Sequence, residues 1–410
     1  MSFHPFILLF FVSAASAWAG SVTLSVEGAA DYALKHNPTL AAARLRIDEA
    51  RGRLHQAGRL SNPEVELELN RNIRAPEGAV GVALMQKFPL TARLRLEKAV
   101  SRAELAAAEA EVRDAERKLV AEVRTAVVRL LTIDGQQALR TKQFINSRDL
   151  AGFTRKRAES GEASVVDASL VDLEVLQLHT EVLQLEVERA ALIGELRPML
   201  GMTASDDPMI AGGLPPIRSL PARGANPAAR PDFEAAQMTA EAARQGASLA
   251  RAQKWEDLAV GFNVTEERSE DAPEGFERDT FVGLRFSLPL PLWNSNAGRI
   301  QEATAAAARA EKETEALALT IGAEAAAARE AMAALAKVVA SLDSEVLPKA
   351  SQVEEQLRAA YATGQTPLQE VLRARDRRLA LELQRLAALR DYHLARVRHE
   401  AAVGKPRSTK

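Results

Sequence analysis

Four short stretches of the chain alternate between apolar and polar residues, the pattern of half-buried β-strands. The predicted strands are Val65–Asn70, Val80–Phe88, Leu258–Thr265 and Phe281–Leu288. They fall into two pairs, so they predict two β-hairpins, over residues 64–88 and 258–288. The polar segments between the paired strands, 71–79 and 266–279, predict loops.

A very long helical pattern follows each predicted hairpin. Residues 93–159 contain no proline, and as one helix they would extend about 100 Å. The second pattern runs from about Gly298 to Tyr361, with Pro348 expected to bend it. Helices of this length need a bundle or coiled-coil partner. Apolar residues spaced by three and four positions predict one part of the packing seam of the first helix. This part consists of Val120, Val123, Val127 and Leu130.

Each long helix is predicted to turn at a glycine, Gly161 or Gly364, and to be followed by an antiparallel return helix. Capping patterns start the return helices, Ser164 with Asp167 in the first and Thr366 with Gln369 in the second. The first return helix is expected to end near Pro198. Its predicted seam against the preceding helix consists of Leu173, Leu176, Thr180, Leu183, Val187 and Ala190.

The chain is a tandem repeat. Val80-Gly81-Val82 recurs as Val282-Gly283-Leu284 and Pro89-Leu90 recurs as Pro291-Leu292, at offsets of 282 − 80 = 202 and 291 − 89 = 202. Each copy is predicted to contain a helix, a β-hairpin, a long helix and a return helix. The predicted organisation is an export signal (1–19), a first repeat (20–200), a Gly- and Pro-rich linker (201–230), a second repeat (231–402) and a short basic tail (403–410).

The first 19 residues have the features of a cleavable export signal. Phe6–Val12 is a short apolar run, and Ala17-Trp18-Ala19 is an A-x-A cleavage site. No other stretch is apolar for the about 18 residues that a transmembrane helix needs. If the mature chain crosses a membrane, strands must do so.

Four amphipathic strands are too few for a barrel with a useful bore, and an open edge is not viable in lipid. A membrane-spanning sheet would therefore have to pool strands from several chains. A protein with two hairpins packed on helices and no pore fits the alternation equally well.

Composition argues against several other classes of function. The formal net charge is −2, which gives no reason to expect a nucleic-acid partner, and the absence of cysteine excludes disulfides and thiolate metal sites. The six histidines do not cluster along the chain, and there is no glycine-rich phosphate loop. Asp206-Asp207, near Met202 and Met209, is better explained as solvated linker than as a metal site. We predict no enzymatic activity, no cofactor and no metal site.

The repeat and several motifs together resemble the TolC-type outer-membrane efflux proteins. These motifs are NPTLAAARLRIDEARGRLHQAGRLSNPE, FVGLRFSLPLPLWNSNAGRI, RAESGEASVVDASL and YATGQTPLQEVLRARD. The LPLPLW-N-x-N-x-G-R segment is most similar to the CzcC-type branch, which accompanies metal-cation pumps. The resemblance implies an inner-membrane pump of the RND type as a partner.

The resemblance implies a mainly helical fold in which a coiled-coil tunnel is joined to four strands per chain. Three chains would pool these strands into one barrel in the outer membrane, with most of the mass in the periplasm. A periplasmic adaptor and an inner-membrane pump would be the partners, and the channel would conduct cargo passively. A type I polypeptide-secretion duct and a periplasmic coiled-coil scaffold without a pore are the alternatives. Lipidation is not expected, because the chain has no cysteine.

Site residues follow from the pattern and the resemblance together. Both predicted turns are expected to form the adaptor-docking tip, and residues just beyond them are expected to line the entrance aperture. The tip residues are Arg157, Gly161, Ser164, Tyr361, Gly364 and Thr366; the aperture residues are Asp167, Glu370 and Arg373. Arg373 stands where some relatives carry a second acid, so a doubly acidic gate is not expected.

Strand alternation assigns the two faces of the predicted barrel. The residues expected to face lipid are Leu67, Val260, Leu284 and Phe286; those expected to face the lumen are Glu66, Asn263 and Arg285. Trp293, just beyond the last strand, is expected at the periplasmic membrane interface.

Overall fold

A computed structural model describes residues 21–162, 164–217, 220–221, 226–271 and 275–404 of the chain. The predicted export signal and residues 405–410 of the predicted tail lie outside these residues. The chain divides into two compact units. We call them the turn unit (Met1–Asn37, Leu119–Ser219 and Ala331–Val397) and the sheet unit (Pro38–Lys118, Leu220–Glu330 and Arg398–Lys410). Neither unit coincides with a sequence repeat, since each takes segments from both.

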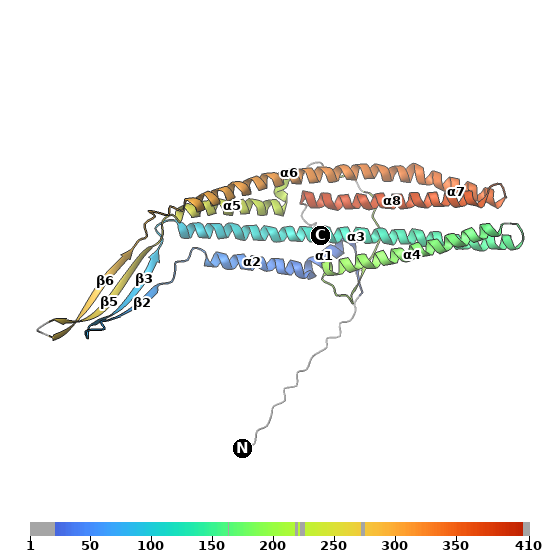
Figure 1. Cartoon of the computed structure of the whole chain (residues 1–410). Coiled ribbons are helices and arrows are strands. Elements are labelled where there is room, and N and C mark those ends of the chain that lie inside the picture. The colour runs from blue at the N-terminus through green and yellow to red at the C-terminus, as the bar shows by residue number, and fades with distance from the viewer. Residues whose placement is uncertain (1–20, 163, 218–219, 222–225, 272–274, 405–410) are drawn as a thin grey trace, which may run out of the picture. The chain divides into compact units, whose positions relative to one another are not determined.

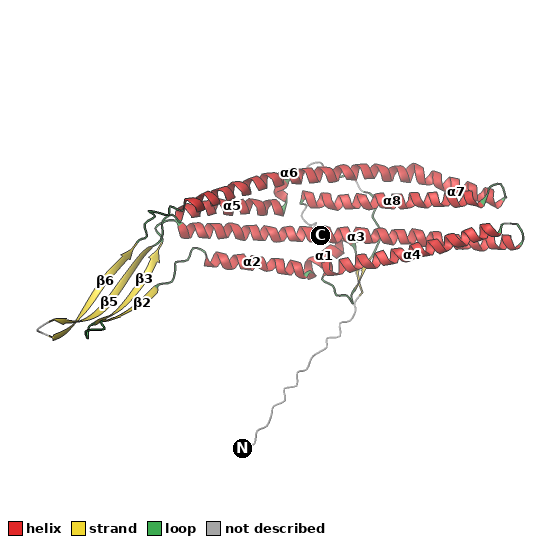
Figure 2. Ribbon diagram, viewed as in Figure 1, coloured by secondary structure: helices red, strands yellow, loops and turns green. Residues whose placement is uncertain are grey.

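Helices account for most of the chain, and the larger sheet belongs to the sheet unit (Figure 2). The helices are α1 Val26–His36, α2 Pro38–Gln56, α3 Arg93–Glu159, α4 Val165–Leu200, α5 Pro231–Ala252, α6 Ala297–Ser341, α7 Leu347–Ala362 and α8 Leu368–Val403. The strands are β1 Ser21–Leu24, β2 Glu64–Arg71, β3 Gly78–Phe88, β4 Asp207–Ile210, β5 Leu258–Asp271 and β6 Gly275–Ser287. The α3 helix has the predicted bounds. Within the described residues, none of the helices combines the length and the apolar character needed to span a bilayer.

The sheet unit contains a four-stranded antiparallel sheet in the order β2–β3–β5–β6 (Figure 1). The predicted loop over residues 266–279 is wrong, because β5 continues to Asp271 and β6 begins at Gly275. Charged side chains line this extension, and Arg278 and Glu266 approach to 3.6 Å across the two strands. Backbone pairing does not require apolar side chains, so the hairpin continues beyond the last apolar pair.

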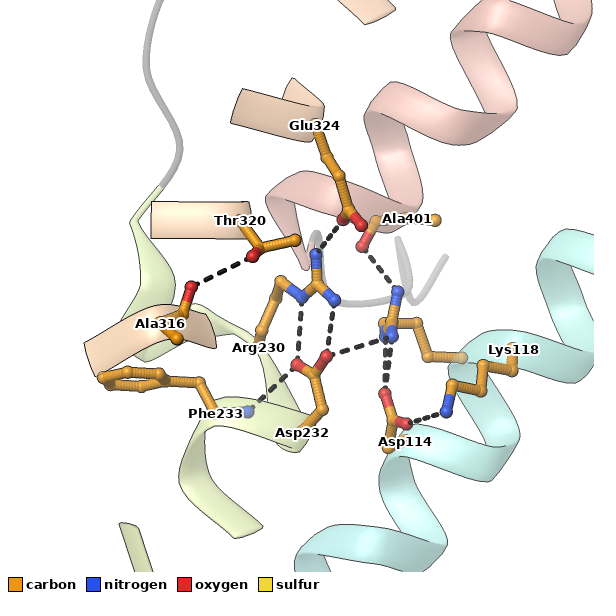
Figure 3. A network of polar contacts seen from close by, with 10 residues as sticks. Asp114, Lys118, Arg230, Asp232, Phe233, Ala316, Thr320, Glu324 and Ala401 are labelled. Carbon is orange, nitrogen blue, oxygen red and sulfur yellow. Dashed lines mark hydrogen bonds and ion pairs between the residues drawn. The ribbon is translucent and has the colours of Figure 1, made fainter. Parts of the chain in front are cut away.

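Ion pairs and a hydrogen bond join α3, α5, α6 and α8 within the sheet unit (Figure 3). The side chain of Arg230 is 6% exposed; it donates to both carboxylate oxygens of Asp232 and, at 2.8 Å, to Glu324. Arg117 donates to Asp114 and, at 2.8 Å, to the carbonyl of Ala401. Burial alone would raise the pKa of Asp232, but the hydrogen bonds and positive charge of Arg230 outweigh it and lower that pKa. This network fixes the C-terminal end of α8 against the start of α5.

The core of the turn unit is formed by α1, α3 and α4. It contains three of the predicted seam residues, Val123, Val127 and Leu130, all at most 1% exposed, and Val120 packs against it. The first predicted seam is therefore confirmed. Its partners are alanines of α1 and Ile193, Leu196 and Leu200 at the end of α4. The α4 helix ends at Leu200, two residues beyond Pro198.

The predicted linker, residues 201–230, contains regular structure that the sequence pattern did not indicate. Its β4 strand pairs in parallel with β1, from Ser21 opposite Asp207 to Leu24 opposite Ile210. A short 3₁₀-helix, Pro227–Ala229, precedes α5. Asp206 accepts hydrogen bonds from the backbone N–H and hydroxyl of Thr203, at 2.7 and 2.8 Å, so it closes a turn.

The second long helical pattern is interrupted near Pro348, as predicted. A π-helical turn, Leu342–Val346, separates α6 from α7, and Pro348 lies in the first turn of α7. Proline has no N–H and its ring collides with the carbonyl one turn back, so regular α-helix cannot pass through it unchanged. The wider π turn accommodates this position.

Candidate functional site

The four-stranded sheet has one apolar and one polar face. Its register places Leu67, Val260, Leu284 and Phe286 on the same face, with Val65, Val82, Leu84, Phe262, Val264 and Val282. Most of these side chains are strongly exposed; Leu67 is 65% exposed and Leu284 70%. Glu66, Asn263 and Arg285 lie on the opposite face. Both faces are exposed within one chain, since the side chains of Arg285 and Glu66 on the polar face are 49% and 54% exposed.

The polar face is concave. Arg285 on β6 donates to Glu66 on β2 at 3.2 Å, although β3 and β5 lie between them. Three inter-strand spacings over a flat sheet would be about 14 Å. Side chains stand roughly perpendicular to a sheet, so this contact across two intervening strands indicates that the sheet curves toward the polar face. Sequence analysis assigned both residues to one face but did not anticipate their contact.

Small residues make this curvature possible. The floor of the concave face contains Gly81, Ala83 and Gly261, all buried. A Cβ atom added at Gly261 would lie 1.9 Å from the sulfur of Met85, so Met85 occupies the space above this glycine. The concave face is thus built from small residues beneath a charged pair.

The turns at Gly161 and Gly364 have the same geometry. Their φ angles are 77° and 76°, in the left-handed region that favours glycine. In the first turn, Gly161 N–H donates to the carbonyl of Ala158 and Glu162 N–H to that of Arg157. In the second, Gly364 N–H donates to the carbonyl of Tyr361 and Gln365 N–H to that of Ala360. Both turns are therefore Schellman motifs. Ser164 then caps α4 by accepting from the N–H of Val166 at 3.1 Å.

The structure brings the two turns together within the turn unit. The guanidinium of Arg157 lies 5.6 Å from the ring centroid of Tyr361 and 5.7 Å from that of Phe153. Apolar contacts support this stacking; the buried members are Ala151, Val171 and Leu368, and Tyr361 packs against them. Thr366 lies between Gly364 and the start of α8. The sequence placed these residues at one end but did not identify their partners.

The aperture residues do not form an acidic cluster. Glu370 accepts from Arg373 at 2.8 Å on the surface of α8, three residues apart. The charge of Glu370 is therefore compensated on its own helix. Asp167 lies in the first turn of α4. Within the described part of the chain, its side chain forms no hydrogen bond or ion pair with Glu370 or Arg373.

A buried polar cluster that the sequence did not reveal lies a few turns from Gly161 and Gly364. Arg375 of α8 is 6% exposed and donates to Ser147 of α3 and, at 2.8 Å, to Glu174 of α4. With its amide oxygen facing the guanidinium, Gln143 accepts from Arg375 Nε at 2.7 Å. Burial, followed by the negative charge of Glu174, raises the pKa of Asp376. This cluster, which we call the Arg375 cluster, joins α3, α4 and α8.

The predicted seam of α4 is wrong. Leu173, Leu176 and Val187 are 62%, 65% and 70% exposed, and Thr180, Leu183 and Ala190 are also exposed. The buried face of α4 instead contains Ala168, Val171, Leu178, Ile193, Leu196 and Leu200. The helix carries two apolar stripes, and only one of them packs within the chain. We call the uncovered one the outer α4 stripe (Leu173, Leu176, Leu183 and Val187).

A family model, described as outer membrane efflux protein, matches the chain twice, over residues 29–202 and 227–405. None of the curated proteins matches the chain by sequence comparison. Several solved structures share its fold. CusC has a TM-score of 0.78 at 18% identity, covering 93% of this chain and 92% of the other.

Two further structures agree with this similarity. A membrane protein from Pseudomonas aeruginosa has a TM-score of 0.78 at 21% identity, covering 92% of this chain and 93% of the other. VceC, an outer membrane protein of Vibrio cholerae, has a TM-score of 0.75 at 19% identity, covering 92% and 96%. At 18–21% identity, these similarities show that the chains share a fold.

Proposed function

This chain belongs to the outer membrane efflux protein family, and from that premise we propose that it is the outer-membrane channel of a tripartite efflux system. Three copies pool their strands into one barrel, and their helices form a periplasmic tunnel that meets an adaptor and an inner-membrane pump of the RND type. The channel conducts its cargo passively. Metal cations are the first cargo to test, because of the LPLPLWNSNAGR segment.

The observation that carries this proposal is the curved sheet. Its concave face is polar, with Arg285 and Glu66 paired across it, and its convex face is apolar and exposed. Among the described residues, β2 pairs only with β3 and β6 only with β5, so both edges are open. An apolar convex face suits lipid, and open edges are satisfied in lipid by neighbouring strands. Leu284 would then face lipid, Arg285 the lumen, and Trp293 the membrane interface.

Cysteine accessibility tests this assignment directly, since the chain has no native cysteine. We expect Arg285→Cys in lipid vesicles to react with a water-soluble maleimide, and Leu284→Cys to react far more slowly. The two positions are adjacent on β6 and differ only in the face to which they point. Equal labelling would contradict the assignment. Ion conductance of the purified chain in planar bilayers distinguishes a channel from a periplasmic scaffold without a pore.

The outer α4 stripe supports assembly of several copies. A row of leucines and valine on one helix is stable in water when another helix covers it. We expect Leu176→Glu combined with Leu183→Glu to abolish the trimer in mild detergent, as measured by native mass spectrometry. Both side chains are exposed within one chain, so the helices should still form.

A matched control lies one residue further along the same helix. Gln177→Glu with Gln184→Glu adds the same two charges at exposed positions beside the stripe. This variant should remain trimeric. A trimer of unchanged mass in the Leu176 and Leu183 variant would show that the stripe is not a contact between copies.

A further inference from the structure

A pocket of about 690 Å³ lies where the strands of the sheet unit meet its helices. The sheet contributes one row near its end, which consists of Lys87, Ala259 and Ser287. The connections before β5 and after β6 and the first turn of α6 supply other walls; the connections contribute Lys254, Trp255, Glu256 and Trp293, and α6 contributes Arg299. Its volume is in the range of ordinary ligand sites.

Polar contacts within the sheet unit hold the frame of this pocket. Asn296, at a φ of 60°, donates through its side chain to the carbonyl of Ala250 at 2.8 Å. The hydroxyl of Thr91 donates to the carbonyl of Ala252 at 3.1 Å. Arg93 pairs with Asp257 at 2.6 Å. These bonds fix three separate connections against one another, so the walls do not depend on a ligand for their positions.

Two unpaired cations and two indoles line the pocket and could contact a ligand. Lys87 and Arg93 are engaged with carboxylates, whereas the side chains of Lys254 and Arg299 form no hydrogen bond or ion pair with any part of the chain that the structure describes. Of the two acids that line the pocket, Asp257 pairs with Arg93 and Glu256 forms no ion pair with the described residues. The pocket therefore has two unpaired cations for one unpaired acid. Trp255 is 42% exposed and Trp293 95%.

Apolar side chains continue beside the pocket along the connection after β6. Leu290 is 58% exposed and Leu292 71%, and Pro289 and Pro291 alternate with them. Water-exposed leucines next to indoles and unpaired cations suit a ligand with an acyl body and an anionic head. A cationic head would be repelled by Lys254 and Arg299, and an inorganic anion would leave the apolar groups unused.

We propose that this pocket binds the phosphate headgroup of an anionic phospholipid, with Lys254 and Arg299 contacting the phosphate and Trp255 and Trp293 the upper acyl region. The proposal rests on the proposed outer-membrane location, because this end of the sheet must meet a bilayer. The connections after β3, before β5 and after β6 would then bind a lipid as well as join the strands to the helices.

Tryptophan fluorescence reports on this site selectively. The sequence contains three tryptophans: two line the pocket, and the third, Trp18, lies in the predicted export signal. The purified chain, carrying Trp18→Phe if the signal is retained, is placed in bilayers that mix brominated phosphatidylglycerol with ordinary phosphatidylcholine, and in the reverse mixture. Comparing the quenching of the two mixtures gives the relative affinity for the two headgroups.

We expect the wild-type chain to favour phosphatidylglycerol by about 25-fold, since each of the two cations near an anionic headgroup contributes about a 5-fold preference. Lys254→Gln with Arg299→Gln should bring the ratio close to one. Arg309→Gln with Lys312→Gln, which removes two exposed cations of α6 that pair with acids of their own helix, should leave the wild-type ratio unchanged.

Three results would overturn the inference. Equal quenching by both lipids in the wild-type chain would remove the headgroup preference, and an unchanged ratio in the Lys254 and Arg299 variant would place it elsewhere. A change in tryptophan emission on adding inorganic phosphate, without a phosphatidylglycerol preference, would assign the pocket to a soluble anion. Failure of the proposed function gives a different signature, namely no ion conductance and no quenching by either brominated lipid.

Discussion

Replacing Arg375 with methionine should lower the free energy of unfolding by about 3–5 kcal/mol, the usual cost of removing one partner of a buried ion pair. Arg375 is the cation of the Arg375 cluster, and Glu174, with a side chain 18% exposed, would lose the guanidinium that compensates its charge. Ser147 and Gln143 would also lose their shared donor. The measurement is thermal unfolding in mild detergent, followed by circular dichroism.

A double-mutant cycle separates the ion pair from the packing of the arginine stem. Glu174→Gln alone should also destabilise the chain, because Arg375 then stays buried without its carboxylate. Combining Arg375→Met with Glu174→Gln should cost less than the sum of the two single changes. Additive losses would show that the two side chains are not coupled. Arg373→Met, two residues away on the surface of α8, should change stability by less than about 1 kcal/mol.

Replacing Gly364 with valine should abolish efflux while leaving the chain in the outer membrane. The φ of Gly364 is 76°, and a left-handed conformation costs a residue with a Cβ atom roughly 1–2 kcal/mol, most severely a β-branched one. The Schellman turn would open, and with it the stacking of Arg157 on Tyr361. A cell lacking the wild-type chain, supplied with the variant, should accumulate metal ions or dyes as the deletion strain does.

Asparagine at the same position is the matched control. Asparagine tolerates positive φ, and no atom lies within 4 Å of a Cβ built at Gly364, so Gly364→Asn should keep the turn and retain efflux. Gly161→Val and Gly161→Asn should behave as the corresponding Gly364 variants do. If both valine variants exported normally and still crosslinked to the adaptor, the turns would be simple hairpins and the entrance would lie elsewhere.

Local signals predicted most of the elements. The bounds of α3, the two glycine turns and the cap at Ser164 follow from residues close together in sequence, and the structure has all of them. The seam of α4 failed for a specific reason. That helix has apolar residues on two sides, both stepping by three and four, and periodicity reports a stripe without saying what covers it. Only the packing with α3 identified the buried stripe.

Contacts between distant segments account for the remaining misses. The Arg375 cluster joins residues more than two hundred positions apart, and Arg285 meets Glu66 across two intervening strands. No spacing rule links such residues, because the pairing depends on helix packing and on sheet curvature. The sequence did place Arg285 and Glu66 on one face. Their contact, and the concave shape that it requires, needed the three-dimensional register.

The pairing of β1 with β4 has a consequence for the order in which the chain can fold. Ser21 lies opposite Asp207, so the first strand cannot pair until the whole first repeat and the start of the linker have been delivered. Such distant closure is slow compared with local helix formation. During export the leading end of the chain would therefore stay unpaired for longer than the helices that follow it. It would be open to a protease or a chaperone until β4 arrives and the segment becomes part of the sheet.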